Sequence, residues 1–138
     1  MRTQMVGAGS YLFKWFDHIQ SGGSFNSGMD DFPRPPNTQY HVDAQAWMYE
    51  LTKFMALASQ TFEKDAAPFY HEQMNKIKDN LQLFLEPTKA IYLDVLMGND
   101  GSRAWSPYIG YGSVLPLSFG MVDSGSPQFK TTLNLLTS

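Results

Sequence analysis

Helical periodicity dominates the middle of the sequence. From Asp43 onward, apolar side chains recur three or four positions apart, and Glu50 and Lys53 fall between them. Residues with this spacing share one face of an α-helix, so the pattern predicts an amphipathic helix over 43–61. We expect its apolar face, including Trp47, to pack in the core. The face consists of Ala44, Trp47, Met48, Leu51, Phe54, Met55 and Ala58.

A second helix is expected directly after the first. Asp65 is a suitable N-cap, and Pro68 fits a first turn, where backbone amides have no helical partner. Pro87 should end the helix, because proline cannot continue a helical hydrogen-bond ladder. A short connection between two such helices predicts an antiparallel pair. The second apolar face consists of Phe69, Tyr70, Met74, Ile77, Leu81, Phe84 and Leu85.

The rest of the chain predicts further helices joined by long loops. Residues 21–40 and 86–110 are rich in turn-forming residues and lack a sustained apolar period, so we expect loops there. The nearly uncharged segment 111–122 predicts a buried helix, and Ser126 followed by Pro127 predicts the start of another. Alternation of apolar and polar residues never persists, so we predict an all-α fold of antiparallel helix pairs with the long loops at one end.

Composition excludes several classes of function. The net charge of −3, without charged blocks, removes the basis for binding nucleic acid. The chain has no cysteine, and its three histidines, His18, His41 and His71, lie far apart, so we expect no metal and no cofactor. No stretch reaches the ~18 apolar residues of a membrane helix. Contact with a membrane is therefore expected only through a segment outside this sequence.

The acid pair Asp30-Asp31 is the first candidate for chemistry. It lies within residues 27–34, SGMDDFPR, in a loop rich in glycine and proline. Such a pair can form a turn, bind a cation weakly, or act in catalysis. Arg34 could hold one carboxylate and leave the other beside an apolar side chain, where its pKa would rise. We therefore predict an active-site loop over 21–42.

Four segments carry a family resemblance. Residues 27–34 resemble the SGLDDYPR signature of the processing α-glucosidase I family, and 41–47, HVDAQAW, resembles part of its ERHxDLRCW signature. Residues 108–117 are similar to the family's GY-x-x-x-x-P-L segment, and 14–20 to its WF-x-x-TQ segment. The similar segments are spread over most of the chain.

This resemblance implies a fold, an activity and a site. The implied fold is an (α/α)₆ toroid. The implied reaction removes the terminal α-1,2-linked glucose of an N-glycan precursor with inversion, in the endoplasmic reticulum, and its partner is the oligosaccharide substrate. Asp30 would be the general acid, which protonates the departing glycosidic oxygen. The resemblance assigns substrate binding to Asp31, Arg34, His41, Asp43 and Trp47.

The chain also departs from the family pattern. Gln39, Tyr40 and Gln45 replace charged residues of the second signature. An inverting glycosidase needs a second carboxylate as base, and no glutamate of this chain lies in a matching motif. We therefore expect residues 1–138 to form one partial catalytic domain, a piece of the toroid that lacks the base. Its exposed helix faces predict aggregation or a molten state.

Two other classes of function remain open. The chain could be a non-catalytic carbohydrate-binding or vestigial helical domain that keeps a sugar subsite without the base. It could also derive from a related enzyme, such as a trehalase-like enzyme or a bacterial α-glucosidase. The DDFPR continuation after Met29 favours α-glucosidase I over these relatives.

Overall fold

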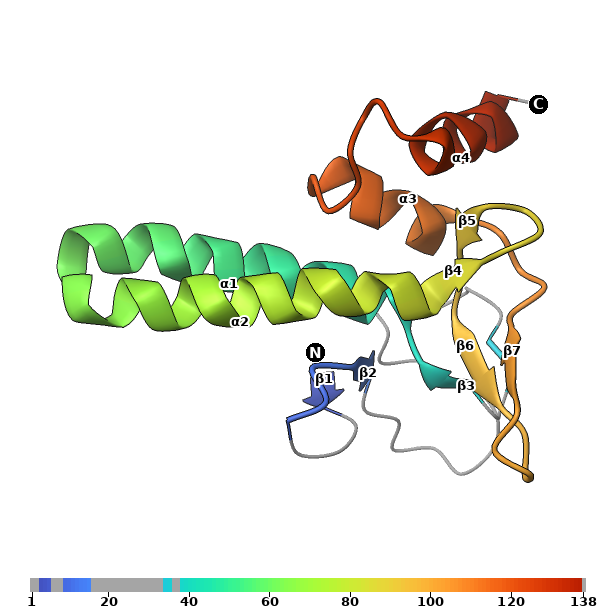
Figure 1. Cartoon of the computed structure of the whole chain (residues 1–138), viewed down its shortest axis with the longest axis horizontal. Helices are drawn as coiled ribbons and strands as arrows, with labels where there is room; N and C mark the ends of the chain where they lie inside the picture. Colours follow the sequence, from blue (N-terminus) through green and yellow to red (C-terminus); the bar gives the residue numbers. More distant parts are fainter. Residues whose placement is uncertain (1–2, 6–8, 16–33, 36–37, 138) are drawn as a thin grey trace.

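A long helical hairpin projects from a cluster of short strands and helices (Figure 1). The computed structural model describes residues 3–5, 9–15, 34–35 and 38–137. Helices α1 (Val42–Phe62) and α2 (Ala67–Asp79) run side by side along the hairpin. Small antiparallel sheets and helices α3 (Tyr111–Ser118) and α4 (Pro127–Thr137) gather at one end of it.

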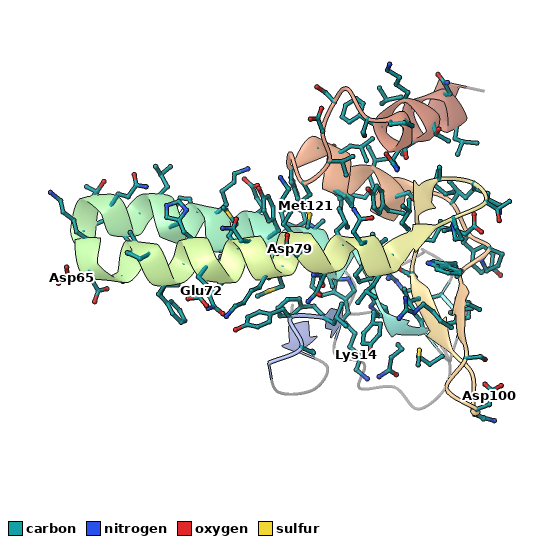
Figure 2. The ribbon with its side chains drawn as sticks, in the orientation of Figure 1. Lys14, Asp65, Glu72, Asp79, Asp100 and Met121 are labelled. Atoms are coloured by element: carbon teal, nitrogen blue, oxygen red, sulfur yellow. The ribbon has the colours of Figure 1, made fainter. Side chains whose placement is uncertain are left out.

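The hairpin confirms the expected pair of antiparallel helices. A short 3₁₀ turn, η1 (Lys64–Ala66), connects α1 to α2, and Asp65 lies at the tip of the hairpin (Figure 2). Pro68 occupies the first turn of α2, as predicted. The N-cap prediction is wrong, because Ala66 holds that position and has no side-chain cap. A second 3₁₀ segment, η2 (Asn80–Phe84), extends α2 into the core.

The predicted apolar face of α1 is largely the wrong face. Trp47, Leu51 and Phe54 are 46%, 52% and 62% exposed. The first turn of α1 is buried on all sides, and beyond it the buried residues are mainly small or polar. The buried residues after that turn are Tyr49, Thr52, Ala56 and Ser59.

Close helix packing explains this inversion. Small side chains on a helix allow a neighbouring helix to approach closely, and their burial gives little signal in a hydrophobic pattern. The hydroxyls of Thr52 and Ser59 donate to the carbonyls of Met48 and Met55, four residues earlier in α1. These bonds satisfy the hydroxyls within their own helix, so burying them costs little. Hydrophobicity alone therefore points to the opposite face.

The outward face of α1 carries an apolar stripe of Trp47, Leu51, Phe54 and Phe62, which we call the outer stripe. We expect it to drive self-association of the isolated chain, because exposed apolar patches favour contact. The double substitution Leu51→Glu and Phe54→Glu should weaken association by about 10²-fold, since each side chain contributes about 1.5–3 kcal/mol when buried. Sedimentation velocity across a concentration series measures the effect.

A control places one added negative charge elsewhere on α1. Gln60 is exposed and lies away from the outer stripe by helical spacing, so Gln60→Glu should leave association unchanged. If the wild-type chain keeps one sedimentation coefficient at all concentrations, the outer stripe does not mediate self-association.

The prediction of an all-α fold is wrong. Residues 85–105, which largely coincide with the predicted loop 86–110, form two antiparallel hairpins. A strand near residue 39, inside the predicted loop 21–42, adds to one of them, and two strands closer to the N-terminus pair with each other. The strands are β1 (Thr3–Met5), β2 (Phe13–Trp15), β3 (Thr38–Tyr40), β4 (Leu85–Glu86), β5 (Ile91–Tyr92), β6 (Val95–Met97) and β7 (Arg103–Trp105).

Short strands account for the error. A segment of two or three residues cannot establish the alternation that identifies a strand in a sequence. The sequence does indicate the turn between β6 and β7, where Gly101 adopts a φ of +79° that glycine tolerates. The chain therefore combines α and β elements, and the described residues do not form an arc built from helices alone.

Helix α3 ends earlier than expected, at Ser118 instead of residue 122. Gly120 follows with a φ of +76° and donates its amide to Leu117, while Met121 donates to Pro116. This bond pair is the Schellman motif, in which a left-handed glycine closes a helix. Gly120 was thus a readable stop signal.

The start of α4 confirms the prediction for Ser126 and Pro127. The Ser126 hydroxyl accepts a hydrogen bond from the Phe129 amide at 3.2 Å. Pro127 is the first residue of α4, where its missing amide hydrogen costs nothing. Local capping rules were sufficient here because every participant lies within four residues.

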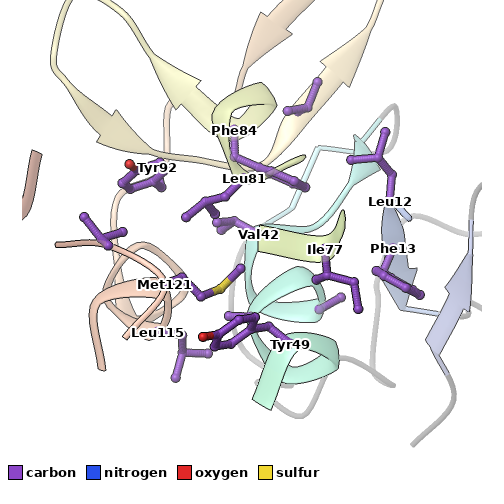
Figure 3. Close-up of a cluster of buried hydrophobic side chains, with 14 of the residues drawn as sticks. Leu12, Phe13, Val42, Tyr49, Ile77, Leu81, Phe84, Tyr92, Leu115 and Met121 are labelled. Carbon is purple, nitrogen blue, oxygen red and sulfur yellow. The ribbon is translucent and has the colours of Figure 1, made fainter. Parts of the chain in front are cut away.

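The hydrophobic core lies where the hairpin meets the sheets (Figure 3). Phe84 is fully buried there, with Ile77 and Leu81 from the end of the second helical segment around it. Val42 joins the cluster from the start of α1, and Leu115 joins it from α3. The core therefore fixes the first turn of α1 against the β-rich end, which is where the charged cluster described below lies.

Candidate functional site

A buried arginine joins two buried carboxylates at the start of α1. Arg34 donates from Nη2 to Oδ2 of Asp43 at 2.6 Å and from Nη1 to Oδ2 of Asp94 at 2.7 Å. The three side chains are 4%, 1% and 3% exposed. We call this cluster the Arg34 bridge. It connects the segment before β3, the first turn of α1 and the connection between β5 and β6.

The N-terminus of α1 helps to hold both carboxylates. The first amides of a helix have no partner within the helix, and they attract negative charge. Asp94 Oδ1 accepts from the Val42 amide at 2.8 Å, and Asp43 Oδ1 accepts from the Ala44 amide at 2.8 Å. His41, the N-cap residue, makes no side-chain cap. A residue distant in sequence, Asp94, therefore supplies the contact that a local cap would make.

Strand β2 is attached to the same place. The Trp15 indole Nε1 donates to Asp43 Oδ2 at 2.9 Å, and the Trp15 amide donates to His41 Nδ1 at 3.1 Å. The His41 amide donates to the Phe13 carbonyl at 3.0 Å. Because Nδ1 is an acceptor, the neutral ring carries its proton on Nε2.

Burial sets the charge states of the site. Burial, together with the charges of Arg34 and Lys14, lowers the pKa of His41 from 6.5 to about 2. His41 is therefore a neutral hydrogen-bond donor and not a cation. Burial raises the pKa of Asp94 from 3.8 to about 6, an effect that Arg34 opposes and Asp43 reinforces. At neutral pH, Asp94 is ionised and faces Arg34.

Comparison with known proteins decides the family. The family model described as the glycosyl hydrolase family 63 C-terminal domain matches residues 3–106. The chain belongs to glycosyl hydrolase family 63. A mannosyl-oligosaccharide glucosidase of Saccharomyces cerevisiae is 28% identical over 118 residues, 80% of this chain. These residues span only 14% of the length of that relative.

The Arg34 bridge lies inside the part that matches glycosyl hydrolase family 63. Of the predicted site residues, the structure brings together Arg34, His41 and Asp43, which are linked directly or through Trp15. The acid pair at 30 and 31 lies outside the described residues. Arg34 binds Asp43 and Asp94, a pairing that its position near the acid pair did not suggest.

Trp47 lies one turn beyond Asp43 on α1. The prediction that it packs in the core is wrong. Its ring is 46% exposed and meets Phe119 edge to face, with centroids 4.9 Å apart. Phe119 follows α3, so the contact joins α1 to the end of that helix. An indole with an accessible surface can stack on the apolar face of a sugar ring.

Two members of the site were missed from the sequence. Asp94 gave no usable signal, because it lies in a predicted loop and 60 residues from Arg34. Trp15 lies in the segment similar to the family's WF-x-x-TQ pattern, yet nothing in that pattern indicated a bond to Asp43. Both contacts depend on tertiary structure.

The described residues offer no group of three histidine, aspartate or glutamate side chains that could hold a metal ion. The two carboxylates of the Arg34 bridge already bind a guanidinium, which makes them poor ligands for a cation. None of the helices in the described ranges is long and apolar enough to cross a membrane.

Proposed function

We propose that this chain carries the acid-bearing part of a glycosidase site that removes the terminal α-1,2-linked glucose of an N-glycan precursor with inversion. The observation that carries this proposal is the buried Arg34 bridge within the family 63 match. Burying three charges is costly, and buried charged groups with shifted pKa values are concentrated at functional sites. The printed name of the yeast relative supports a mannosyl-oligosaccharide substrate.

The proposed catalytic residue is Asp30, acting as the general acid. It precedes Arg34 by four residues, so covalent geometry keeps the two Cα atoms within about 14 Å of each other. The Arg34 bridge fixes the position of Arg34 in the folded chain. Protonation of the glycosidic oxygen lets the rest of the glycan leave from C1 of the glucose, while a water molecule that the base deprotonates attacks C1 from the opposite face. The base of the inverting reaction is not assigned to a residue of this chain.

Substrate binding is proposed for the residues around the acid. Arg34 and Asp43 would hold the sugar site in shape together with Asp31. His41 would donate a hydrogen bond through its protonated Nε2 without adding charge. Trp47 would offer its exposed ring for stacking on a sugar face. An N-glycan precursor as substrate would place the reaction in the endoplasmic reticulum.

Binding and hydrolysis of an α-1,2-linked glucosyl disaccharide test the proposal. In a form of the protein that also carries the catalytic base, Asp30→Asn should lower glucose release by about 10²-fold or more, because it removes the proton donor, and should leave the Kd nearly unchanged. Calorimetric titration and a glucose assay measure the two quantities. A 4-linked α-glucosyl disaccharide is the matched control ligand.

Each outcome separates the candidate functions. Binding without glucose release in the form that also carries the catalytic base would favour the carbohydrate-binding alternative. Equal turnover in the wild type and in Asp30→Asn would remove Asp30 from the mechanism. Absence of binding to either disaccharide would contradict a sugar site altogether.

A further inference from the structure

Asp94 makes more connections than any assigned role requires. Its Oδ2 accepts from Arg34 and its Oδ1 from the Val42 amide, while its carbonyl accepts from the Ser106 amide at 2.9 Å. One residue thus joins the segment before β3, the first turn of α1 and the residue after β7. The side chain is buried, so solvent cannot replace these contacts.

We propose that Asp94 is a positioning residue for the sugar site: it fixes the orientation of the Arg34 guanidinium relative to Asp43 and the start of α1. The inference rests on the proposed function, because it assigns to Asp94 the control of that same site. Asp94 need not touch the sugar, since it would act through Arg34.

The geometry supports this role. A guanidinium held by a single carboxylate can pivot about that contact, whereas attachment through both Nη atoms fixes its plane. Asp43 holds Nη2 and Asp94 holds Nη1, so both contacts are needed to define the orientation. A second constraint comes from Val42, because its amide ties the same carboxylate to α1.

Only an ionised carboxyl group can make both bonds of Asp94. Arg34 Nη1 and the Val42 amide are donors, and they face the two oxygens of one side chain. An asparagine has nearly the same volume but only one acceptor oxygen. Its NH₂ group would therefore face either Arg34 Nη1 or the Val42 amide, and both of these are donors. Asp94→Asn should therefore disturb the orientation of Arg34 with little change in packing.

The first measurement is sugar binding by the whole chain. In Asp94→Asn we expect the Kd for the α-1,2-linked glucosyl disaccharide to rise about tenfold, which corresponds to one charge-assisted hydrogen bond. Asp100→Asn is the matched control, because Asp100 lies at the tip of the β6–β7 hairpin and bonds only locally to Ser102 (Figure 2). An unchanged Kd in folded Asp94→Asn would overturn the proposal.

The second measurement needs no ligand and follows the Trp15 indole proton by NMR. This proton binds Asp43 Oδ2, the oxygen that also accepts from Arg34, so it reports on the Arg34 bridge. Burial raises the pKa of Asp94 to about 6. The Trp15 resonance, identified with Trp15→Phe, should shift as the pH falls through about 6 and should not titrate there in Asp94→Asn.

The groups around Asp94 do not obscure its titration near pH 6. Among the residues that the structure describes, the charged groups that act on Asp94 are Arg34 before β3 and Asp43 on α1, and His41 remains neutral because its pKa is about 2. If Asp94→Asn fails to fold, the wild-type titration decides: a Trp15 resonance that does not shift at any pH between neutrality and the acid unfolding of the chain overturns the proposal. A wild type that folds and titrates but binds no disaccharide refutes the proposed function and, with it, the role of Asp94 in a sugar site.

Discussion

Replacing Arg34 by alanine should lower the free energy of unfolding by about 3–5 kcal/mol at neutral pH, the usual effect of breaking a buried ion pair. The substitution leaves two carboxylates, Asp43 and Asp94, buried without their cation. Neither carboxylate can reach solvent in the folded state, whereas both are hydrated in the unfolded state. The substitution therefore favours the unfolded state. Urea denaturation followed by far-UV circular dichroism measures the change.

The dependence of this loss on pH identifies its cause. Burial already raises the pKa of Asp94, and Arg34 opposes that rise, so removing Arg34 should raise the pKa further. Protonation of Asp94 in the folded variant removes one of the two uncompensated charges. The deficit relative to the wild type should therefore shrink as the pH falls from about 7 to about 5.

Lys53→Ala is the matched control for the loss of a cation. Lys53 pairs with Glu50 at 2.6 Å, but both side chains are well exposed to solvent. Such pairs contribute about 0–1 kcal/mol, so Lys53→Ala should stay within that range. If Arg34→Ala is no more destabilising than Lys53→Ala, the buried Arg34 bridge is not present in the folded protein.

Phe84→Ala should lower the free energy of unfolding by a similar amount, about 3–5 kcal/mol. Phe84 is fully buried at the junction of the hairpin and the sheets, where neighbouring side chains cannot fill the cavity. Its carbonyl also accepts from the amide of Leu93, the residue before Asp94. The substitution should therefore loosen the segment that holds Asp94 in addition to destabilising the core.

Phe69→Ala provides the comparison for the core substitution. Phe69 is the same residue type on α2, but 57% of it is exposed. Its removal should cost no more than about 1 kcal/mol in the same urea titration. Equal losses for Phe69→Ala and Phe84→Ala would contradict the packing described for the junction.

Prediction from the sequence worked where the signal was local. The two long helices follow from apolar spacing, and the cap at Ser126 follows from a side chain that bonds three residues away. The pattern failed for the orientation of α1, because Ala56 and Ser59 are buried while larger apolar side chains, such as those of Leu51 and Phe54, are exposed. The buried face of α1 is marked by small and polar residues more than by large apolar ones.

The residues of the candidate site fall into those that the sequence identified and those that it did not. Arg34, His41 and Asp43 could be identified from residues that resemble family signatures, and all three lie together in the structure. Asp94 could not be identified, because its contacts cross 52 and 60 residues of sequence. No local pattern encodes which distant carboxylate will share an arginine.

The sequence by itself determined the helical hairpin with Pro68 in the first turn of α2 and the start of α4 at Ser126, since each depends on residue types at short spacing. It also determined the membership of glycosyl hydrolase family 63, through residues that match the family pattern along the chain. Only the tertiary structure decided which face of α1 is buried, that very short strands pair, and that Asp94 completes the Arg34 bridge. These features depend on contacts between distant segments, whose stability comes from shared burial and not from the preference of any one segment.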